Sequence, residues 1–124
     1  MKEMVYKNKS IAELLDSGIH DGYEYAIVSR GTHPCAYVKL PHGHKYYGVD
    51  YGDIPVECHW GLTYSDNRLD VLPLRSGWWI GWDYSHCSDY SGRWLETDLS
   101  DLKKWTTAEI LDEVKDVIRQ VKEL

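Results

Sequence analysis

Phenylalanine is absent from this 124-residue chain, which nevertheless contains 6 tryptophans and 10 tyrosines. Every Trp and Tyr side chain carries a polar atom that needs a hydrogen-bond partner, so these residues favour half-wet sites and interfaces over dry cores. The composition therefore indicates either a ligand-stacking pocket or an interface, with a chance choice among the aromatic residues as the alternative.

Long apolar runs are also lacking. No segment approaches the ~20 apolar residues that a helix needs to cross a bilayer, so we expect no membrane partner. The first residues, MKEMVYKNKS, contain no apolar stretch of the kind that a signal peptide carries. These absences predict a protein of the cytoplasm.

Cysteine is scarce and has no metal-binding spacing. Cys35, Cys58 and Cys87 are odd in number and form no C-x-x-C pair, which argues against a disulfide framework and against a zinc ribbon. We expect all three thiols to be reduced and to serve as small buried hydrophobes.

Clustered positive charge is missing as well. Lys and Arg number 14 against 20 Asp and Glu, which gives a formal net charge of −6, and the basic residues are scattered apart from Lys103 and Lys104. Binding a nucleic-acid polymer requires grouped cations, so such a partner is disfavoured. A small anionic ligand is compatible with this composition, because one pocket can be locally positive on an acidic protein.

The length and the hydrophobic patterns predict one α+β domain over residues 1–124. A capping box at Ser10–Glu13 predicts a short helix over 10–17, and a second at Thr106–Glu109 predicts a closing helix over 107–122. Between them we expect a long loop at 41–55 and an antiparallel sheet of four to five strands. The predicted strands are 23–30, 35–40, 56–64, a weak 69–74, and 78–84.

Alternation along two of these strands predicts which side chains share a face. In the 56–64 strand, Glu57, His59 and Thr63 share one face, with a gap at Gly61 that a ligand could enter. In the 78–84 strand, one face carries Trp78, Ile80 and Trp82, and the other carries Trp79, Gly81 and Asp83.

Polar and aromatic residues concentrate in two runs, at 42–64 and 78–89, which we interpret as two halves of one site. Paired histidines can act as general base and general acid on a phosphoester, with a carboxylate to orient an imidazole. The candidate catalytic residues are His44, His59, His86, Asp83 and Asp89. Hydroxyl donors and stacking rings supply the candidate ligand-binding residues, Tyr46, Tyr47, Tyr51, Trp60, Thr63, Tyr64 and Trp79.

Three segments resemble motifs of a family of small, mostly uncharacterised bacteriophage proteins. They are the run Gly43–Tyr51, the run Cys58–Thr63 and the run Trp78–Asp89, although Lys45 replaces a usual proline and Trp60 a usual glycine. The resemblance covers roughly residues 35 to 90. It implies a phage origin and a role against host defences, where some such proteins bind or destroy nucleotide immune signals.

The leading hypothesis is metal-free binding, with or without cleavage, of a small nucleotide-type ligand in the host cytoplasm. The alternatives are a non-catalytic nucleotide sponge, a protein inhibitor of a host defence enzyme, and a metal-dependent hydrolase that uses the histidines and aspartates as ligands. For each histidine the plain alternative is a structural hydrogen bond. We expect no cofactor, and an aromatic-rich surface would suit a homodimer.

Overall fold

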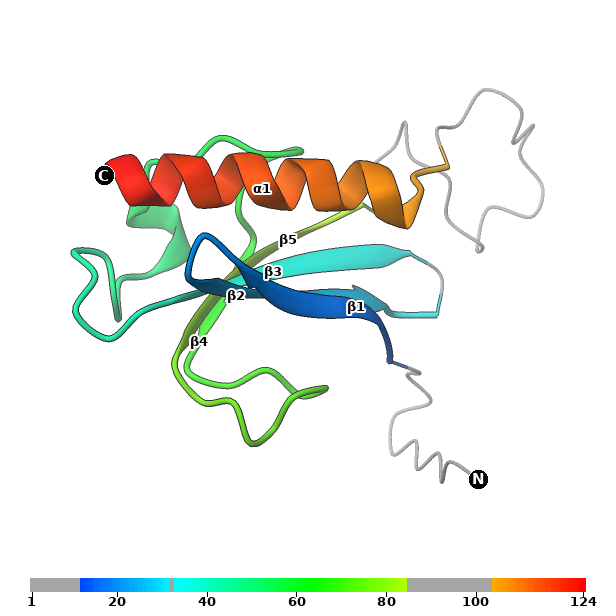
Figure 1. Ribbon diagram of the computed structural model, residues 1–124, viewed down its shortest axis with the longest axis horizontal. Coiled ribbons are helices and arrows are strands. Elements are labelled where there is room, and N and C mark those ends of the chain that lie inside the picture. The colour runs from blue at the N-terminus through cyan, green and yellow to red at the C-terminus, as the bar shows by residue number, and fades with distance from the viewer. Residues whose placement is uncertain (1–11, 32, 85–103) are drawn as a thin grey trace.

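The computed structural model describes residues 12–31, 33–84 and 104–124, and Figure 1 shows how they are arranged. A five-stranded antiparallel sheet carries one long helix across one of its faces. The elements are β1 (Glu13–His20), β2 (Tyr23–Ser29), β3 (Pro34–Leu40), a short 3₁₀ turn η1 (Tyr51–Asp53), β4 (Tyr64–Asp66), β5 (Trp78–Asp83) and α1 (Thr107–Glu123). The expected α+β class with a mainly antiparallel sheet and a C-terminal helix is confirmed.

The strands are ordered β1-β2-β3-β5-β4, and every neighbouring pair is antiparallel. β1 and β2 form a hairpin that turns at Asp21 (φ 54°) and Gly22 (φ 85°). Positive φ at both turn residues is typical of the type I′ turn, whose twist matches that of the strands. β5 lies between β3 and β4, so it is a central strand of the sheet.

The predicted N-terminal helix is wrong over the residues that the structure describes. Residues from Glu13 onward form strand β1, which pairs with β2 from Glu13↔Ser29 to His20↔Tyr23 and contains one irregularity between Leu14 and Asp16. The capping-box pattern is a local signal, and the tight turn at Asp21-Gly22 overrides it by bringing this segment back along β2. The first residues of the expected helix lie outside the described part.

The closing helix forms where its apolar period predicts. Thr106 accepts a hydrogen bond from the Glu109 amide while Glu109 accepts one from the Thr106 amide, so the capping box is complete. Five apolar residues on one face of α1 are buried against the sheet, namely Ile110, Val114, Val117, Ile118 and Val121. No helix among the described residues is both long and apolar enough to cross a membrane.

Each face of the sheet packs against its own group of buried side chains. The side chains of β5 alternate between the two faces as predicted. Trp82 and Ile80 pack under α1 together with the partly buried Trp78. Trp79 lies on the opposite face with Val28, and this second core is closed by the segment that connects β4 to β5. The helix therefore covers one face, and a connecting segment covers the other.

Two expected strands do not form. Of the 56–64 strand only Tyr64 lies in regular structure, because β4 begins there, and the preceding residues run irregularly along α1. The Cys58–Gly61 stretch forms a turn, with Trp60 at φ 60° and Gly61 at φ 84°. Backbone polar groups in this segment bond to α1 side chains, which replaces strand pairing. Residues 69–74 form turns as well.

Candidate functional site

His44 is held by hydrogen bonds at both ring nitrogens. Its Nε2 lies 2.7 Å from the carbonyl oxygen of Val121 in the last turn of α1, and its Nδ1 accepts a hydrogen bond of 3.0 Å from the Tyr46 amide. A ring that accepts at Nδ1 and donates at Nε2 is the neutral tautomer. In this arrangement the imidazole fastens the loop after β3 to the end of the helix.

His59 lies against the other half of the helix. Its ring stacks on Tyr84 with centroids 4.7 Å apart, and its main-chain amide donates to Glu113 Oε2 at 2.7 Å. The Tyr84 hydroxyl donates to the other oxygen of Glu113 and accepts a hydrogen bond from Trp82 Nε1. Burial raises the pKa of the Tyr84 phenol, and its bond to Glu113 adds to this.

The structure does not bring His44 and His59 together. Their contacts on α1 are eight residues apart, which at ~1.5 Å per residue separates them by about 12 Å along the helix axis. The expected convergence of these two imidazoles on one cavity is therefore not observed. His86 and Asp89, the other distant members of the predicted set, lie outside the described residues.

Asp83 meets a different predicted residue. Thr63 Oγ1 donates to Asp83 Oδ2 at 3.3 Å, and the Thr63 amide donates to the Gly81 carbonyl at 2.9 Å. Two of the candidate site residues thus join, at the end of β5. The ring of Tyr37 fills the space beside Gly81, whereas a Cβ at Gly61, where the gap was predicted, would have no atom within 4 Å.

The predicted ligand-binding aromatics are dispersed. Trp79 is fully buried, and Tyr64 packs edge-on against Tyr37. Trp60 is 58% exposed on the turn beside α1, whereas Tyr51 lies in η1. Tyr46 packs against the helix-side core, below the cation of Lys45. Tyr47 alone of this set lines the cavity described next.

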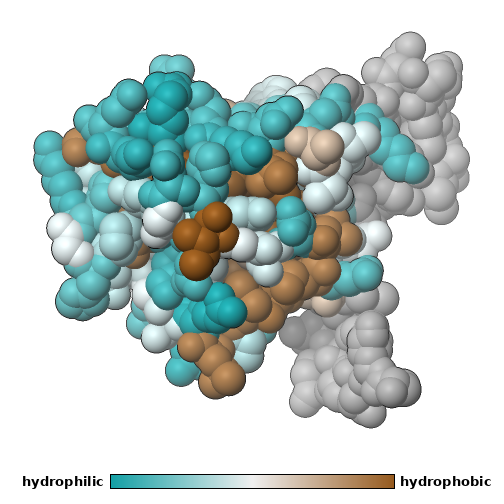
Figure 2. All heavy atoms as spheres, in the orientation of Figure 1, coloured by the Kyte–Doolittle hydropathy of each residue, from teal (hydrophilic) through white to brown (hydrophobic). Residues whose placement is uncertain are grey.

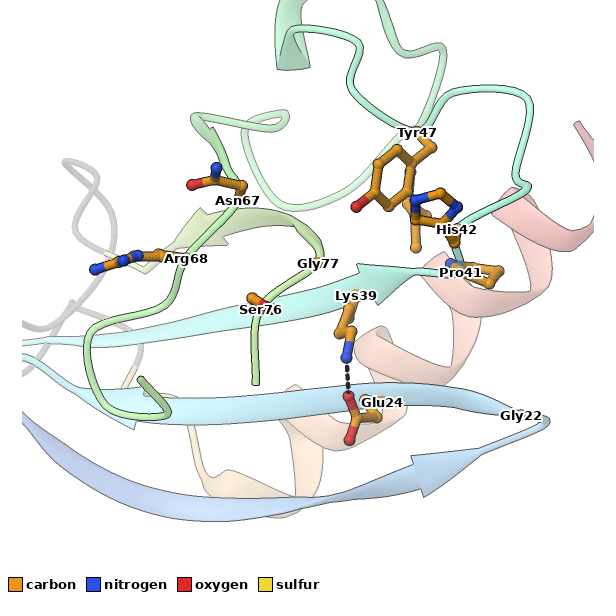
Figure 3. Close-up of a pocket in the computed structure, with 11 residues that line it drawn as sticks. Gly22, Glu24, Lys39, Pro41, His42, Tyr47, Asn67, Arg68, Ser76 and Gly77 are labelled. Carbon is orange, nitrogen blue, oxygen red and sulfur yellow. Dashed lines mark hydrogen bonds and ion pairs between the residues drawn. The ribbon is translucent and has the colours of Figure 1, made fainter. Parts of the chain in front are cut away.

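That cavity has a volume of about 640 Å³ and lies on the sheet face opposite α1. Lys39 and Glu24 come from adjacent strands, and the rings of His42 and Tyr47 come from the loop that follows β3 (Figure 3). The segment around β4 supplies the other side, as Asn67, Arg68, Ser76 and Gly77. Gly22, Leu40 and Pro41 complete the lining.

Lys39 and Glu24 form the cavity floor, and their ion pair extends to Arg75 just outside the lining. Glu24 accepts from Lys39 Nζ at 2.8 Å and from Arg75 at 2.7 Å, so one carboxylate lies between two cations. Its hydrogen bond from Lys39 is the main reason that the pKa of Glu24 is lowered. Gly77 makes room for this arrangement, since a Cβ there would collide with the stem of Lys39.

Positive charge exceeds negative charge around this cavity. Besides Lys39 and Arg75, the rim carries Arg68, whose guanidinium extends outward in Figure 3 and has no ion-pair partner in the described part of the chain. Glu24 is the single carboxylate among the described lining residues. Within the lining, the two cations Lys39 and Arg68 face one carboxylate, and Arg75 adds a third cation just outside it, which makes this region locally positive on a chain whose net charge is −6.

Two neighbouring indoles hold the walls of the cavity. Trp78 Nε1 donates to the Val49 carbonyl at 2.9 Å, which fixes the loop that carries Tyr47, and the Tyr47 and Trp78 rings lie 6.4 Å apart. Trp79 Nε1 donates to the Arg75 carbonyl at 2.8 Å on the other face of β5. The His42 ring lies 4.8 Å from that of Tyr47. The aromatic wall and the cationic floor are thus both positioned by hydrogen bonds.

The sequence interpretation missed the charged part of this site. A lone lysine in the apolar strand CAYVKL and a lone glutamate in YEYAIV were the available signals. The pairing of β2 with β3 brings these two opposite charges side by side. Arg75 comes from a segment 51 residues further along the chain than Glu24.

The described residues form neither a reactive thiol site nor a metal site. Cys35 is buried and Cys58 is half-buried, and neither forms a disulfide. Burial raises the pKa of Cys58 to about 12. A thiol that stays protonated is a weak nucleophile. No group of three or more His, Cys, Asp or Glu side chains is close enough to hold a metal ion in residues 12–31, 33–84 and 104–124.

The chain matches no protein-family model, no curated protein and no solved structure. The resemblance to small phage proteins therefore stays a prediction.

Proposed function

We propose that the protein captures a small anionic ligand of the nucleotide type in the cavity lined by Lys39, and that it does so without cleaving the ligand. The observation that carries this proposal is the excess of cations over carboxylates in the described lining, where Lys39 and Arg68 face Glu24 alone, on an otherwise acidic chain. Cations grouped in a cleft raise the local concentration of anions.

The shape and the walls of the cavity suit such a ligand. Small-molecule sites commonly measure ~300–1,000 Å³, and this cavity measures about 640 Å³. Phosphate oxygens would accept hydrogen bonds from Lys39 and Arg75, while a base would lie against Tyr47. Stacking of a base on an aromatic ring contributes about 1–3 kcal/mol and tolerates any base.

Capture without turnover follows from the lowered pKa of Glu24, the only described carboxylate in the lining. The cations that hold Glu24 lower its pKa, which makes it a poor proton acceptor at neutral pH. Of the three predicted catalytic histidines, His44 and His59 are bound to α1 and are not part of the lining, and His86 lies outside the described residues. The described lining holds a single imidazole, that of His42, and no second histidine to act as its partner.

The resemblance to small phage proteins gives this capture a biological role. A protein that retains a nucleotide immune signal in the host cytoplasm would act as a sponge against the defence that the signal triggers. The rival role, inhibition of a host enzyme by protein contact, would use exposed aromatics such as Trp60, which lies outside the cavity lining.

The test is incubation with a panel of mono-, di- and cyclic nucleotides, followed by mass spectrometry of retained and released ligand. We expect at least one nucleotide to be retained with its mass unchanged. A product of altered mass would overturn the claim of capture without cleavage. Failure to retain any nucleotide at low salt would overturn the proposal as a whole.

Two substitutions locate the bound anion, and a third serves as the control. Lys39→Met should weaken binding of the retained nucleotide by more than tenfold, because a half-buried charge-assisted hydrogen bond contributes ~1.5–3 kcal/mol. Arg68→Gln should weaken it by about threefold, because such a bond contributes less at a rim. Lys115→Met removes the same charge from an exposed position on α1 and should change the affinity less than twofold. Equal effects at Lys39 and Lys115 would place the ligand elsewhere.

A further inference from the structure

Strand β1 forms one edge of the sheet, and its outer side pairs with no strand in the part of the chain that the structure describes. It is eight residues long, whereas β4 at the opposite edge has three. An edge strand presents unpaired amide and carbonyl groups that can accept a further strand. Natural edges usually prevent this with lysine, proline or a very short strand, and β1 (ELLDSGIH) contains no lysine or proline.

The same strand carries exposed apolar side chains. Leu14, Leu15 and Ile19 are 39%, 41% and 69% exposed, and they are three of the seven large hydrophobic residues that are exposed in the described chain. Figure 2 shows apolar surface extending across the region where Figure 1 places β1. Exposed apolar side chains along an open strand edge indicate an interface.

The regular part of β1 is complementary to itself. Asp16, Gly18 and His20 pair with Ile27, Tyr25 and Tyr23 of β2, so their side chains share one face, while Ser17 and Ile19 lie on the other. In an antiparallel pairing centred on Gly18, Asp16 of one copy lies opposite His20 of the other. Two such acid–base pairs would form around one twofold axis, because the contact is the same in both directions.

The centre and the flanks of this pairing also fit. Gly18 adds no side chain at the axis, where the Tyr25 hydroxyl lies 3.0 Å from the place that a Cβ would take. Ile19 of one copy would lie diagonally across from Ile19 of the other, within reach of apolar contact. The irregularity between Leu14 and Asp16 ends the regular stretch on one side, and the turn at Asp21-Gly22 ends it on the other. The pairing therefore has one favoured register.

We propose that two copies of this chain associate through their β1 edges into a continuous ten-stranded antiparallel sheet. A twofold axis perpendicular to the sheet places both α1 helices on the same face and both cavities on the other. The occupant of the edge is a second copy because the carboxylate of Asp16 and the imidazole of His20 complement each other within one sequence. This association does not depend on the ligand and is independent of the proposed function.

Sedimentation equilibrium of the full chain without nucleotide tests the proposal, with two matched variants. The unmodified protein should be dimeric at tens of micromolar, and Ile19→Lys should shift the equilibrium toward monomer by at least tenfold, because a lysine on an exposed edge opposes pairing. Leu74→Lys adds the same charge at a loop residue that is 94% exposed and should leave the equilibrium unchanged. Equal shifts in both variants would overturn the proposal.

A charge exchange tests the register. Asp16→His and His20→Asp should each weaken the dimer at least fivefold, because each single change places like groups opposite each other. The double variant D16H/H20D restores the opposite pairs and should bring the dimer within twofold of the unmodified protein. Failure of the double variant to recover would exclude this register.

A monomer at all concentrations would overturn the proposal. If the β1 amides of such a monomer were also protected from hydrogen exchange, the result would show that another part of the same chain covers the edge.

Discussion

The Nε2 atom of His44 lies 2.7 Å from the carbonyl oxygen of Val121, one of the last carbonyls of α1. The final carbonyls of a helix lack the usual amide partner four residues on; the Val121 carbonyl accepts from the Leu124 amide at 3.4 Å, and His44 supplies a shorter contact from a loop 77 residues away in the sequence. The histidine thereby fastens the loop that lines the cavity to the C-terminal turn of the helix.

His44→Ala should destabilise the fold and leave ligand capture intact. The substitution removes a partly buried hydrogen bond at each ring nitrogen, and the free energy of unfolding should fall by about 1–2 kcal/mol. Urea denaturation followed by far-UV circular dichroism measures this. His42→Ala is the crossed control, since His42 is exposed and lines the cavity. That variant should keep its stability and lose affinity, and the reverse result would assign His44 to the site.

Glu24→Gln should increase the affinity of the cavity for an anionic nucleotide. The carboxylate competes with the ligand for Lys39 and Arg75, and its neutralisation removes an interaction of about 1 kcal/mol, equivalent to roughly fivefold in affinity. Isothermal titration at two salt concentrations measures the change. Glu57→Gln, which neutralises an exposed carboxylate beside α1, should have little effect. A decrease in affinity would show that Glu24 positions the cations.

Gly81→Ala should destabilise the protein because the added methyl group has no space. A Cβ at this position would collide with the Tyr37 ring and lie 2.8 Å from the Ala36 carbonyl oxygen, which belongs to the paired strand and cannot move freely. Overpacking of this kind costs about 1–3 kcal/mol. Gly43→Ala is the control, since a methyl group added there would have no atom within 4 Å and the φ of Gly43 is not positive. Similar melting temperatures for the two variants would contradict the packing.

Acid should destabilise the protein partly through Asp70. Burial opposes ionisation of this carboxyl, but the hydrogen bonds from Arg30 outweigh it and lower the pKa of Asp70 below 3.8. A carboxyl with a lower pKa in the folded state stabilises the fold above its unfolded pKa, and this contribution disappears as the pH falls through the folded value. Asp70→Asn should therefore lower stability at pH 7 by less than about 1 kcal/mol and flatten the decline below pH 4.

The control for acid unfolding is Asp112→Asn on α1, an exposed residue without an ion-pair partner in the described chain. Its acid transition should follow that of the unmodified protein. Thermal melting from pH 7 to pH 2.5 measures all three proteins, and a decline in Asp70→Asn as steep as that of the unmodified protein would remove Arg30–Asp70 as a cause.

Elements that depend on local signals could be predicted from the sequence. The helix α1 carries its own apolar period and its own cap at Thr106, and β5 alternates between two buried faces. The predicted helix over 10–17 failed because an Asp-Gly pair at residues 21 and 22 is a hairpin signal that outweighs a capping box. The 56–64 strand failed because Glu113 and Gln120 of α1 capture its backbone groups.

The site was harder to predict because it depends on distant pairings. Residues close in sequence, such as those around His44 and His59, are distributed over both ends of one helix. The ion-pair network at the cavity floor combines Glu24, Lys39 and Arg75, which only the order of the strands brings together. Of the predicted ligand-binding residues, Tyr47 lies in the cavity, since its loop directly follows the strand of Lys39.

Trp78 and Trp79 are consecutive residues whose indole nitrogens hold opposite walls of the cavity, through Val49 and Arg75. Both bonds run from side chains of β5 to main-chain carbonyls of the connecting loops. This one strand therefore sets the width of the opening, and substitutions in the two loops can occur without altering it. Both indoles are bonded to segments that flank the cavity, so a ligand that shifts those segments should change the intrinsic emission of the unmodified protein.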